Sequence, residues 1–177
     1  MKYLYYPFDD RTGLDTLDKL APAVGTVPSV PASPRIGELY RSDGTCPAGL
    51  WNVGVNDEVF VIGHAAEGMK VLADAQRVQI DQTEIVARLA RCGLRANENC
   101  KIVLYACESG KGGPDSLGAK VASALKNNNF ACCNNVWGFN FKVSMRAHKG
   151  ALCIQTGGSW LPYEEQEYVL MHCPPNH

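Results

Sequence analysis

Apolar runs and amphipathic segments alternate through the middle of the chain. Residues 58–62 and 101–106 are short, continuous runs rich in β-branched and aromatic side chains, which is typical of buried strands. Between them, Asp81 followed three residues later by Glu84 matches a capping box that starts a helix, and Gly93 is suited to end it. Strand, helix and strand in this order predict two parallel strands joined by a crossover helix.

A second helix and several short strands are expected around this unit. Residues 114–116 open the helix, with Asp115 as its N-cap, and apolar side chains then recur at helical spacing up to three consecutive asparagines. Further strand-like segments cover residues 78–80, 136–140, 141–145 and 151–155. The alternation predicts an α/β fold, a three-layer α/β/α sandwich with a mostly parallel central sheet and helices on both faces. The last strands are expected to add a hairpin at one edge of that sheet.

The first third of the chain has a different pattern. Residues 1–6 favour extended structure and are predicted to form an edge strand. Residues 7–55 contain six of the ten prolines and several turn signals, which favours an irregular segment. We expect its large apolar side chains to be buried against the core, namely Leu39, Tyr40, Leu50 and Trp51. We therefore expect a single domain over residues 1–177, with a proline-rich arm at 1–56 packed on a core at 57–177.

Composition and charge exclude several classes of protein. With 46% hydrophobic and 20% charged residues, the 177-residue chain fits one soluble globular domain. A formal net charge of −1 and scattered Lys and Arg residues offer no basic face for nucleic acid or an anionic membrane. No run approaches the roughly 18 apolar residues that a membrane span needs. The apolar N-terminal stretch breaks off at Pro7, too early for a signal peptide, so we expect a protein that is cytoplasmic where it is synthesised.

The eight cysteines raise the question of disulfides or a metal site. Without a signal peptide, and with ample apolar residues for a core, most of them are predicted to be reduced and to pack as small hydrophobes. No Cys-x-x-Cys pair is present, which disfavours zinc. We expect neither a metal nor an organic cofactor.

Reactive side chains follow both predicted buried strands. His64 comes two residues after the first run, and Cys107 directly follows the second. Because the carboxyl ends of parallel strands meet at one edge of a sheet, we expect the two side chains to lie side by side. A thiol needs a base to become a nucleophilic thiolate, and an imidazole can take its proton and later protonate a leaving amine. The backbone N–H groups of Cys107 and Ala65 are placed to stabilise the oxyanion that such an attack creates.

Residues beside this pair have several candidate roles. Gly63 is a small residue that leaves room near the histidine. Glu67 and Glu108 either orient His64, contact a basic substrate side chain or are simply solvated, and solvation is the preferred interpretation. Ser109 has two equally weighted roles, a hydrogen bond near the nucleophile or a turn.

A strand ending in Gly63-His64, then a strand ending in Ala-Cys-x-Ser-Gly at residues 106–110, resembles the caspase-like (clan CD) cysteine peptidases. The nearest pattern is that of the bacterial CHAT domains and toxin autoprocessing domains, and it covers about residues 57–140. The resemblance implies a caspase-type fold, a His64–Cys107 dyad and cleavage of a peptide bond after a side chain held in an S1 pocket. It also suggests a bacterial effector or toxin component, delivered by a dedicated secretion system.

One position departs from the pattern of this family. The family usually has glycine directly after the histidine, and here that residue is Ala65. Alanine keeps the N–H group but fits only where φ is negative, so the chain is either a divergent active enzyme or a decayed one.

The sequence thus predicts a cysteine peptidase that acts on a protein or peptide substrate, with no nucleic acid or membrane partner. Two alternatives remain open. One is a deamidase, transpeptidase or acyltransferase that uses the same dyad, and the other is a non-catalytic binding module on the same fold.

Overall fold

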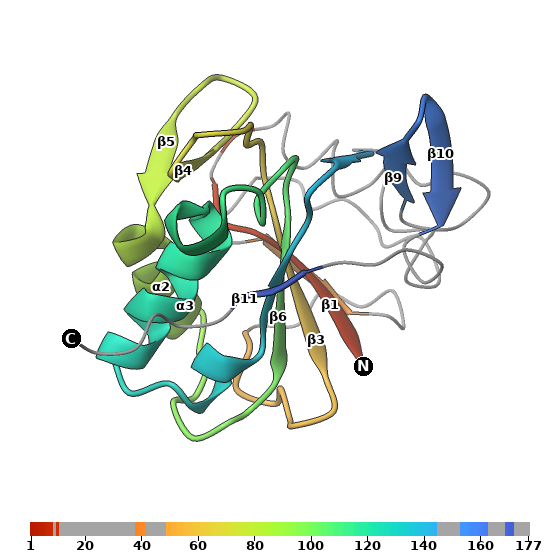
Figure 1. The fold of residues 1–177 in the computed structure, drawn as a ribbon. Coiled ribbons are helices and arrows are strands. Elements are labelled where there is room, and N and C mark those ends of the chain that lie inside the picture. The colour runs from red at the N-terminus through yellow and green to blue at the C-terminus, as the bar shows by residue number, and fades with distance from the viewer. Residues whose placement is uncertain (9, 11–37, 42–48, 145–152, 163–168, 172–177) are drawn as a thin grey trace.

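A computed structural model describes residues 1–8, 10, 38–41, 49–144, 153–162 and 169–171 (Figure 1). Most of the predicted proline-rich arm therefore lies outside the described residues. Of its apolar side chains, Leu50 is fully buried, whereas Trp51 is about half exposed, at 48%.

A six-stranded sheet forms the centre of the molecule, in the order β11-β7-β6-β3-β1-β2. Its strands are β1 (Lys2–Tyr6), β2 (Glu38–Arg41), β3 (Glu58–Ile62), β6 (Lys101–Tyr105), β7 (Val136–Gly138) and β11 (Val169–Met171). The four inner strands run parallel to one another, and the outer strands β2 and β11 are antiparallel to their neighbours. Residues 59–62 and 102–105 are fully buried, as parallel strands covered on both faces require. The mixed α/β fold with a mostly parallel sheet is confirmed.

The N-terminal strand lies inside the sheet, so its prediction as an edge strand was wrong. β1 pairs with β3 on one side and with β2 on the other. Its side chains from Tyr3 to Tyr6 are all buried. A strand lies at the edge of a sheet only when no other segment pairs with its outer side. Here β2 takes that outer position, and the proline-rich composition of its segment gives little strand signal.

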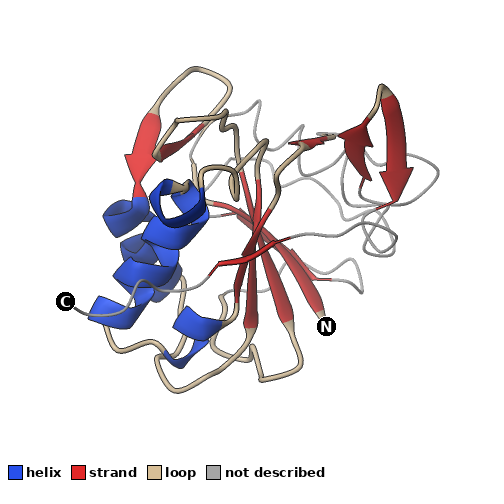
Figure 2. Ribbon diagram, in the orientation of Figure 1, coloured by secondary structure: helices blue, strands red, loops and turns tan. Residues whose placement is uncertain are grey.

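Helices α2 (Gln82–Arg91) and α3 (Leu117–Asn127) pack side by side on one face of the sheet (Figure 2). The connections β3–β6 and β6–β7 step in the same direction across the sheet. Right-handed crossovers place both helices on the same face for this reason. Within the described residues no helix covers the opposite face, so the predicted second helical layer is not seen there.

The two helices begin at side-chain caps. Asp81 Oδ1 accepts the N–H of Glu84 at 2.9 Å, and Gly93 follows α2 with φ +100°, as the sequence predicts. The N-cap of α3 is Ser116, whose Oγ accepts the N–H of Ala119 at 3.1 Å, so the assignment of Asp115 was wrong. Asp115 ends a 3₁₀ turn one residue earlier, and its side chain is exposed.

The later strands form a small sheet of their own rather than a hairpin on the edge of the main sheet. It consists of β8 (Lys142–Val143), β9 (Cys153–Thr156) and β10 (Ser159–Pro162), in the order β10-β9-β8. The edge position beside β7 is occupied by β11 instead. The Tyr105 hydroxyl, at the end of β6, donates to the Ser144 carbonyl (2.9 Å) and accepts the Cys153 N–H (3.2 Å). These bonds hold the small sheet beside the carboxyl end of β6.

A third sheet, a ribbon of two strands, precedes α2. It pairs β4 (Val71–Ala73) with β5 (Gln79–Asp81). The predicted strand at 78–80 corresponds to β5, and β4 was missed because three residues carry too little periodic signal.

Candidate active site

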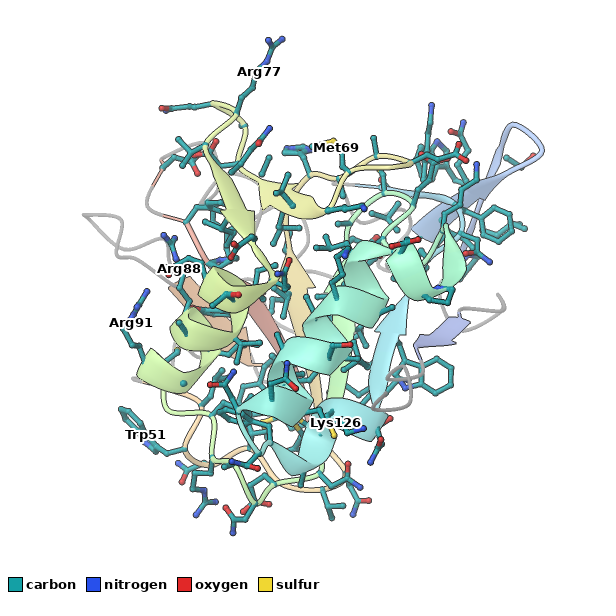
Figure 3. The ribbon with its side chains drawn as sticks, turned by 60° about the vertical axis from the view of Figure 1, so that its left-hand side comes forward. Trp51, Met69, Arg77, Arg88, Arg91 and Lys126 are labelled. Atoms are coloured by element: carbon teal, nitrogen blue, oxygen red, sulfur yellow. The ribbon has the colours of Figure 1, made fainter. Side chains whose placement is uncertain are left out.

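His64 and Cys107 occupy equivalent positions beyond two neighbouring strands. β3 and β6 pair in parallel, with Ile62 opposite Tyr105, and each reactive residue lies two positions further along its strand. Figure 3 places Met69, from the loop after β3, at the opposite end of the molecule from Trp51 and Lys126. The structure therefore brings the backbones of both predicted site residues to one edge of the sheet.

The backbone of His64 is anchored while its side chain is free to act. Its N–H donates to the Ala73 carbonyl (2.8 Å), and its carbonyl accepts the Ala73 N–H (2.9 Å). The imidazole is exposed. Gly63 is needed for packing, because a Cβ there would lie 2.5 Å from Leu72 Cγ. A substituent at Gly63 would push away the β4–β5 ribbon that positions His64.

The two N–H groups expected to form the oxyanion hole are available. Within the part of the chain that the structure describes, neither the Ala65 N–H nor the Cys107 N–H donates to another residue. Positive φ angles among the described non-glycine residues occur only at Arg77, Glu108 and Asn129. Ala65 thus has an ordinary backbone conformation, and the alanine found in place of glycine fits without strain.

The Cys107 thiol is half-buried and protonated at rest. Its Sγ lies 3.7 Å from the Val143 carbonyl oxygen, to which the S–H donates. Burial raises the pKa of this thiol above its usual value of 9.0, since a thiolate would lose hydration there. The hydrogen bond to Val143 lowers the pKa by less than burial raises it, and the charges of Glu108 and Lys142 have smaller effects that raise and lower it, respectively. Among the described residues no hydrogen bond joins the His64 ring to Cys107 Sγ.

Glu67 and Glu108 join the two strand-end loops through Lys111. The Lys111 ammonium lies 2.8 Å from Glu67 Oε2 and 3.3 Å from Glu108 Oε1. The Glu67 N–H also donates to Glu108 Oε2 at 3.0 Å. Within the described structure neither carboxylate is hydrogen-bonded to His64, and neither is simply solvated. Their observed contacts hold the loop that follows β3 against the loop that follows β6.

Glu108 makes the stability of this loop pair depend on pH. The Glu67 N–H, and then Lys111, lower the pKa of Glu108 below its usual 4.5. A depressed pKa stabilises the fold above the unfolded value, and this contribution is lost as the pH falls through the folded value. We expect the wild-type protein to lose more stability than Glu108→Gln between pH 6 and pH 3, as measured by urea unfolding. Glu98→Gln removes a carboxylate that pairs with Arg95 outside these loops and is the control; equal losses in wild type and Glu108→Gln would contradict the prediction.

The Ser109 side chain is hydrogen-bonded to the backbone around the loop that carries Cys107. It is buried, its Oγ donates to the Leu104 carbonyl (2.8 Å), and the same oxygen accepts the Phe139 N–H (3.2 Å). The Ser109 carbonyl accepts the Gly118 N–H at 2.8 Å. One residue thus ties the loop that carries Cys107 to β6, to the end of β7 and to the start of α3.

An open depression of about 570 Å³ lies between the loop that follows β6 and the small sheet, and the sequence did not predict it. It is lined by Glu108 and Lys111, by residues 140–142, and by Gln155 with the Gly157–Gly158 turn. These residues come from three separate segments of the chain, so no local sequence pattern predicts that they line one depression. Lys111 and Lys142 are the charged residues that sequence reasoning missed.

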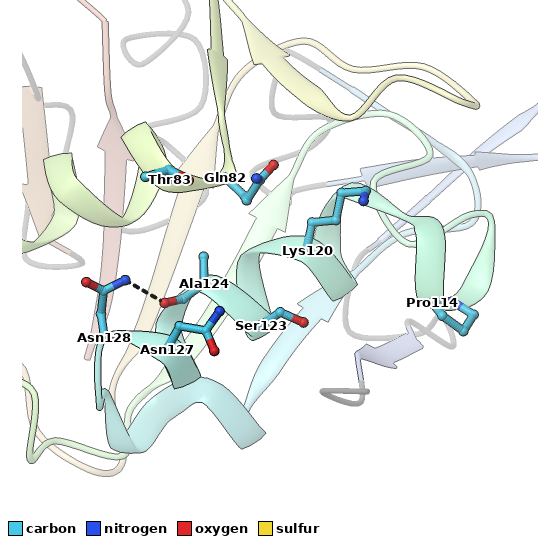
Figure 4. Close-up of a pocket in the computed structure, with 8 residues that line it drawn as sticks. All are labelled: Gln82, Thr83, Pro114, Lys120, Ser123, Ala124, Asn127 and Asn128. Carbon is cyan, nitrogen blue, oxygen red and sulfur yellow. Dashed lines mark hydrogen bonds between the residues drawn. The ribbon is translucent and has the colours of Figure 1, made fainter. Parts of the chain in front are cut away.

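A second groove, of about 310 Å³, lies between the start of α2 and α3 (Figure 4). Its polar side chains include Gln82, Lys120 and Asn128, and Asn128 Nδ2 donates to the Ala124 carbonyl at 2.8 Å. It is lined by no cysteine, histidine or carboxylate, so it offers no second thiol–imidazole pair.

Among the described residues, no group of three or more His, Cys, Asp and Glu is placed to hold a metal ion. No helix in those residues is long and apolar enough to cross a membrane. The sequence matches no protein-family model, and no curated protein matches it.

Proposed function

We propose that this chain is a caspase-like cysteine peptidase, with Cys107 as nucleophile and His64 as general base. The observation that carries the proposal is the parallel register of β3 and β6, which sets these two residues at equivalent positions on one sheet edge. The N–H groups of Ala65 and Cys107 support it, because they donate to no other described residue and an oxyanion hole needs such donors.

The reaction follows from the roles of these groups. His64 takes the proton from Cys107 Sγ, and the thiolate attacks the carbonyl carbon of the scissile peptide bond. The Ala65 and Cys107 N–H groups stabilise the negative oxygen of the tetrahedral intermediate. The imidazolium then protonates the departing amine, which leaves a thioester on Cys107. Water, deprotonated by His64, hydrolyses the thioester and restores the free thiol.

Activation requires one movement of the thiol. At rest the S–H points to the Val143 carbonyl, and burial keeps it protonated. For catalysis the side chain must rotate about χ1 toward His64, so that an imidazolium replaces the lost hydration of the thiolate. The alternative, a non-catalytic binding module with an unreactive buried thiol, predicts that this rotation does not occur.

The finer assignments belong to the same proposal. The caspase-type sandwich is supported by the parallel order β7-β6-β3-β1 and by reactive loops at the carboxyl ends of two inner strands. A role as a secreted bacterial effector or toxin component rests on the resemblance of residues 57–140 to bacterial members of the family.

Thiol labelling tests the proposal directly. We expect iodoacetamide at pH 7 to modify Cys107 faster than Cys92, a second half-buried thiol whose pKa burial raises to about 11. His64→Ala should bring the Cys107 rate down to that of Cys92, as measured by peptide mapping over time. If Cys107 reacts no faster than Cys92 in the wild-type protein, the dyad is wrong and the binding-module alternative is favoured.

Product analysis separates peptidase from the other thiol chemistries. A peptide that contains glutamine should yield two shorter peptides, whereas a deamidase would add one mass unit and leave the chain intact. Transfer of the acyl group to an added amine in place of water would indicate a transpeptidase.

A further inference from the structure

The β4–β5 ribbon holds the backbone of His64 at the end of β3. The N–H and the carbonyl of His64 both pair with Ala73 in an antiparallel bridge, at 2.8 and 2.9 Å. Ala73 is the last residue of β4, and the chain then turns back through residues 74–78 to form β5. The place of the His64 backbone therefore depends on β3 on one side and on this turn on the other.

Asp74 holds the turn through both its side chain and its backbone. Its Oδ1 accepts the N–H of Gln76 at 2.9 Å and the N–H of Val78 at 2.7 Å. Its own N–H donates to the Val78 carbonyl at 3.0 Å, and its carbonyl accepts the Arg77 N–H at 3.2 Å. Asp74 is buried, and these two N–H groups replace hydration that its carboxylate loses there.

The turn needs these bonds because its backbone conformation is unfavourable. Arg77, which Figure 3 shows at the tip of the ribbon, has φ +69°, in the left-handed region that glycine and asparagine usually occupy in hairpins. Such a conformation persists only where the surrounding structure imposes it. The side chain of Asp74 bonds to Gln76 and Val78, on either side of Arg77, and so holds the chain in this conformation.

The end of β1 braces the same turn. β1 and β3 pair in parallel, so Tyr6, the last residue of β1, lies at the sheet edge that also carries His64. The buried Tyr6 hydroxyl donates to Asp10 Oδ2 at 2.7 Å, and the Ala75 N–H of the turn is hydrogen-bonded to the same hydroxyl. Burial, and then Asp10, hold the pKa of Tyr6 well above 10, so the phenol stays protonated. The turn is thus tied to the main sheet as well as to Asp74.

We propose that Asp74 is a positioning residue for His64: braced by Tyr6, it fixes the 74–78 turn, and the turn fixes the His64 backbone through Ala73. The inference rests on the proposed function, since it adds a residue to that same site. Within the described residues no side chain is bonded to the exposed imidazole, so the backbone sets where the ring stands. A shift of about 1 Å in a catalytic group can lower a rate by about 100-fold.

Two substitutions at Asp74 separate the geometry of the turn from the charge of the carboxylate. Asp74→Asn keeps a side-chain oxygen that accepts both N–H bonds, whereas Asp74→Leu has a similar size and accepts neither. With a fluorogenic peptide we expect Asp74→Leu to lower kcat by about 10- to 100-fold with little change in KM, because substrate contacts are left intact. Asp74→Asn should keep the wild-type kcat. A wild-type kcat in Asp74→Leu, or equal losses in both variants, would overturn the inference.

Asp81→Ala is the matched control. Asp81 belongs to the same ribbon, and its Oδ1 also accepts a backbone N–H, that of Glu84 at 2.9 Å. Its loss weakens the start of α2 but leaves the 74–78 turn intact, so kcat should stay at the wild-type value. If Asp81→Ala lowers kcat as much as Asp74→Leu, the effect is general destabilisation and the inference is wrong. Should Asp74→Leu fail to fold, Tyr6→Phe decides: a lower kcat at unchanged KM supports the inference, and a wild-type kcat overturns it.

Amide hydrogen exchange keeps this inference separate from the proposed function, because it requires no activity. The N–H groups of His64 and Ala73 close the bridge between the two segments, and Asp74→Leu should speed their exchange by about 10-fold or more. Asp74→Asn and Asp81→Ala should leave both rates unchanged. Faster exchange in Asp74→Leu, with no hydrolysis by the wild-type protein, would support the link from Asp74 to His64 and overturn the peptidase alone. Unchanged exchange in Asp74→Leu, with hydrolysis by the wild-type protein, would overturn the link alone.

Discussion

Replacing Cys107 by alanine is expected to reduce peptide hydrolysis by about 10⁴-fold or more, the effect of losing a covalent nucleophile. Without the sulfur no thioester forms, and the Ala65 and Cys107 N–H groups then stabilise an oxyanion that is reached only by attack of water. Steady-state cleavage of a fluorogenic peptide, with and without enzyme, measures the loss. Cys92→Ala, which removes another half-buried thiol outside the site, is the matched control and should retain the wild-type rate.

His64→Ala should have a similar but smaller effect, about 10²- to 10⁴-fold, because it removes the general base and acid. The imidazole is exposed and only the backbone of His64 pairs with Ala73, so the fold should tolerate this change. Since the two side chains act as a unit, the double variant should be no slower than Cys107→Ala alone. A Cys107→Ala protein that retains a tenth of the wild-type rate would refute the assigned nucleophile.

Gly138→Ala should destabilise the fold by about 1–3 kcal/mol, the cost of overpacking a well-packed site. A Cβ at Gly138 would lie 2.8 Å from the Gly110 nitrogen and 2.9 Å from its Cα. These are backbone atoms, and they cannot move aside by a change of rotamer. The Gly110 N–H also donates to the Phe139 carbonyl at 2.9 Å, so a displaced loop would stretch this bond as well.

Urea unfolding measures this loss, and Gly54→Ala provides the control. The nearest atom to a Cβ at Gly54 is Asp57 Oδ2 at 3.9 Å, an ordinary contact. Gly110 belongs to the loop that carries Cys107, so Gly138→Ala should also change the labelling rate of this thiol. If Gly138→Ala costs no more than Gly54→Ala, the close approach of β7 to this loop is not a constraint.

The strands that carry the candidate dyad were predictable because their signals are local. The runs that became β3 and β6 are continuous and apolar, and strands buried on both faces require that pattern. Asp81 and Gly93 likewise marked the ends of α2 through caps that involve only neighbouring residues. The sequence misplaced the N-cap of α3 by one residue, since Asp115 and Ser116 are both good caps and packing decides between them.

Strand partners were not predictable, because pairing joins segments that are far apart in the chain. β1 reads as an extended segment in isolation, and only its pairing with β2 and β3 makes it an inner strand. The small sheet was interpreted as an edge hairpin for the same reason, although β11 occupies that edge. Tyr105 holds the small sheet at the end of β6 through hydrogen bonds that span 39 and 48 residues of sequence.

By itself, the sequence determined the two buried strands, their connecting helix and the presence of His64 and Cys107 at the strand ends, since apolar runs and caps are properties of neighbouring residues. Only the tertiary structure decided how those ends are joined and what lies beside them. Lys111 links the two loops, and Lys142 with Gln155 lines the depression between the β6 loop and the small sheet. Charges and hydrogen-bonding groups form a site only when folding brings their segments together. The sequence pattern of one segment does not indicate which distant segments it will contact.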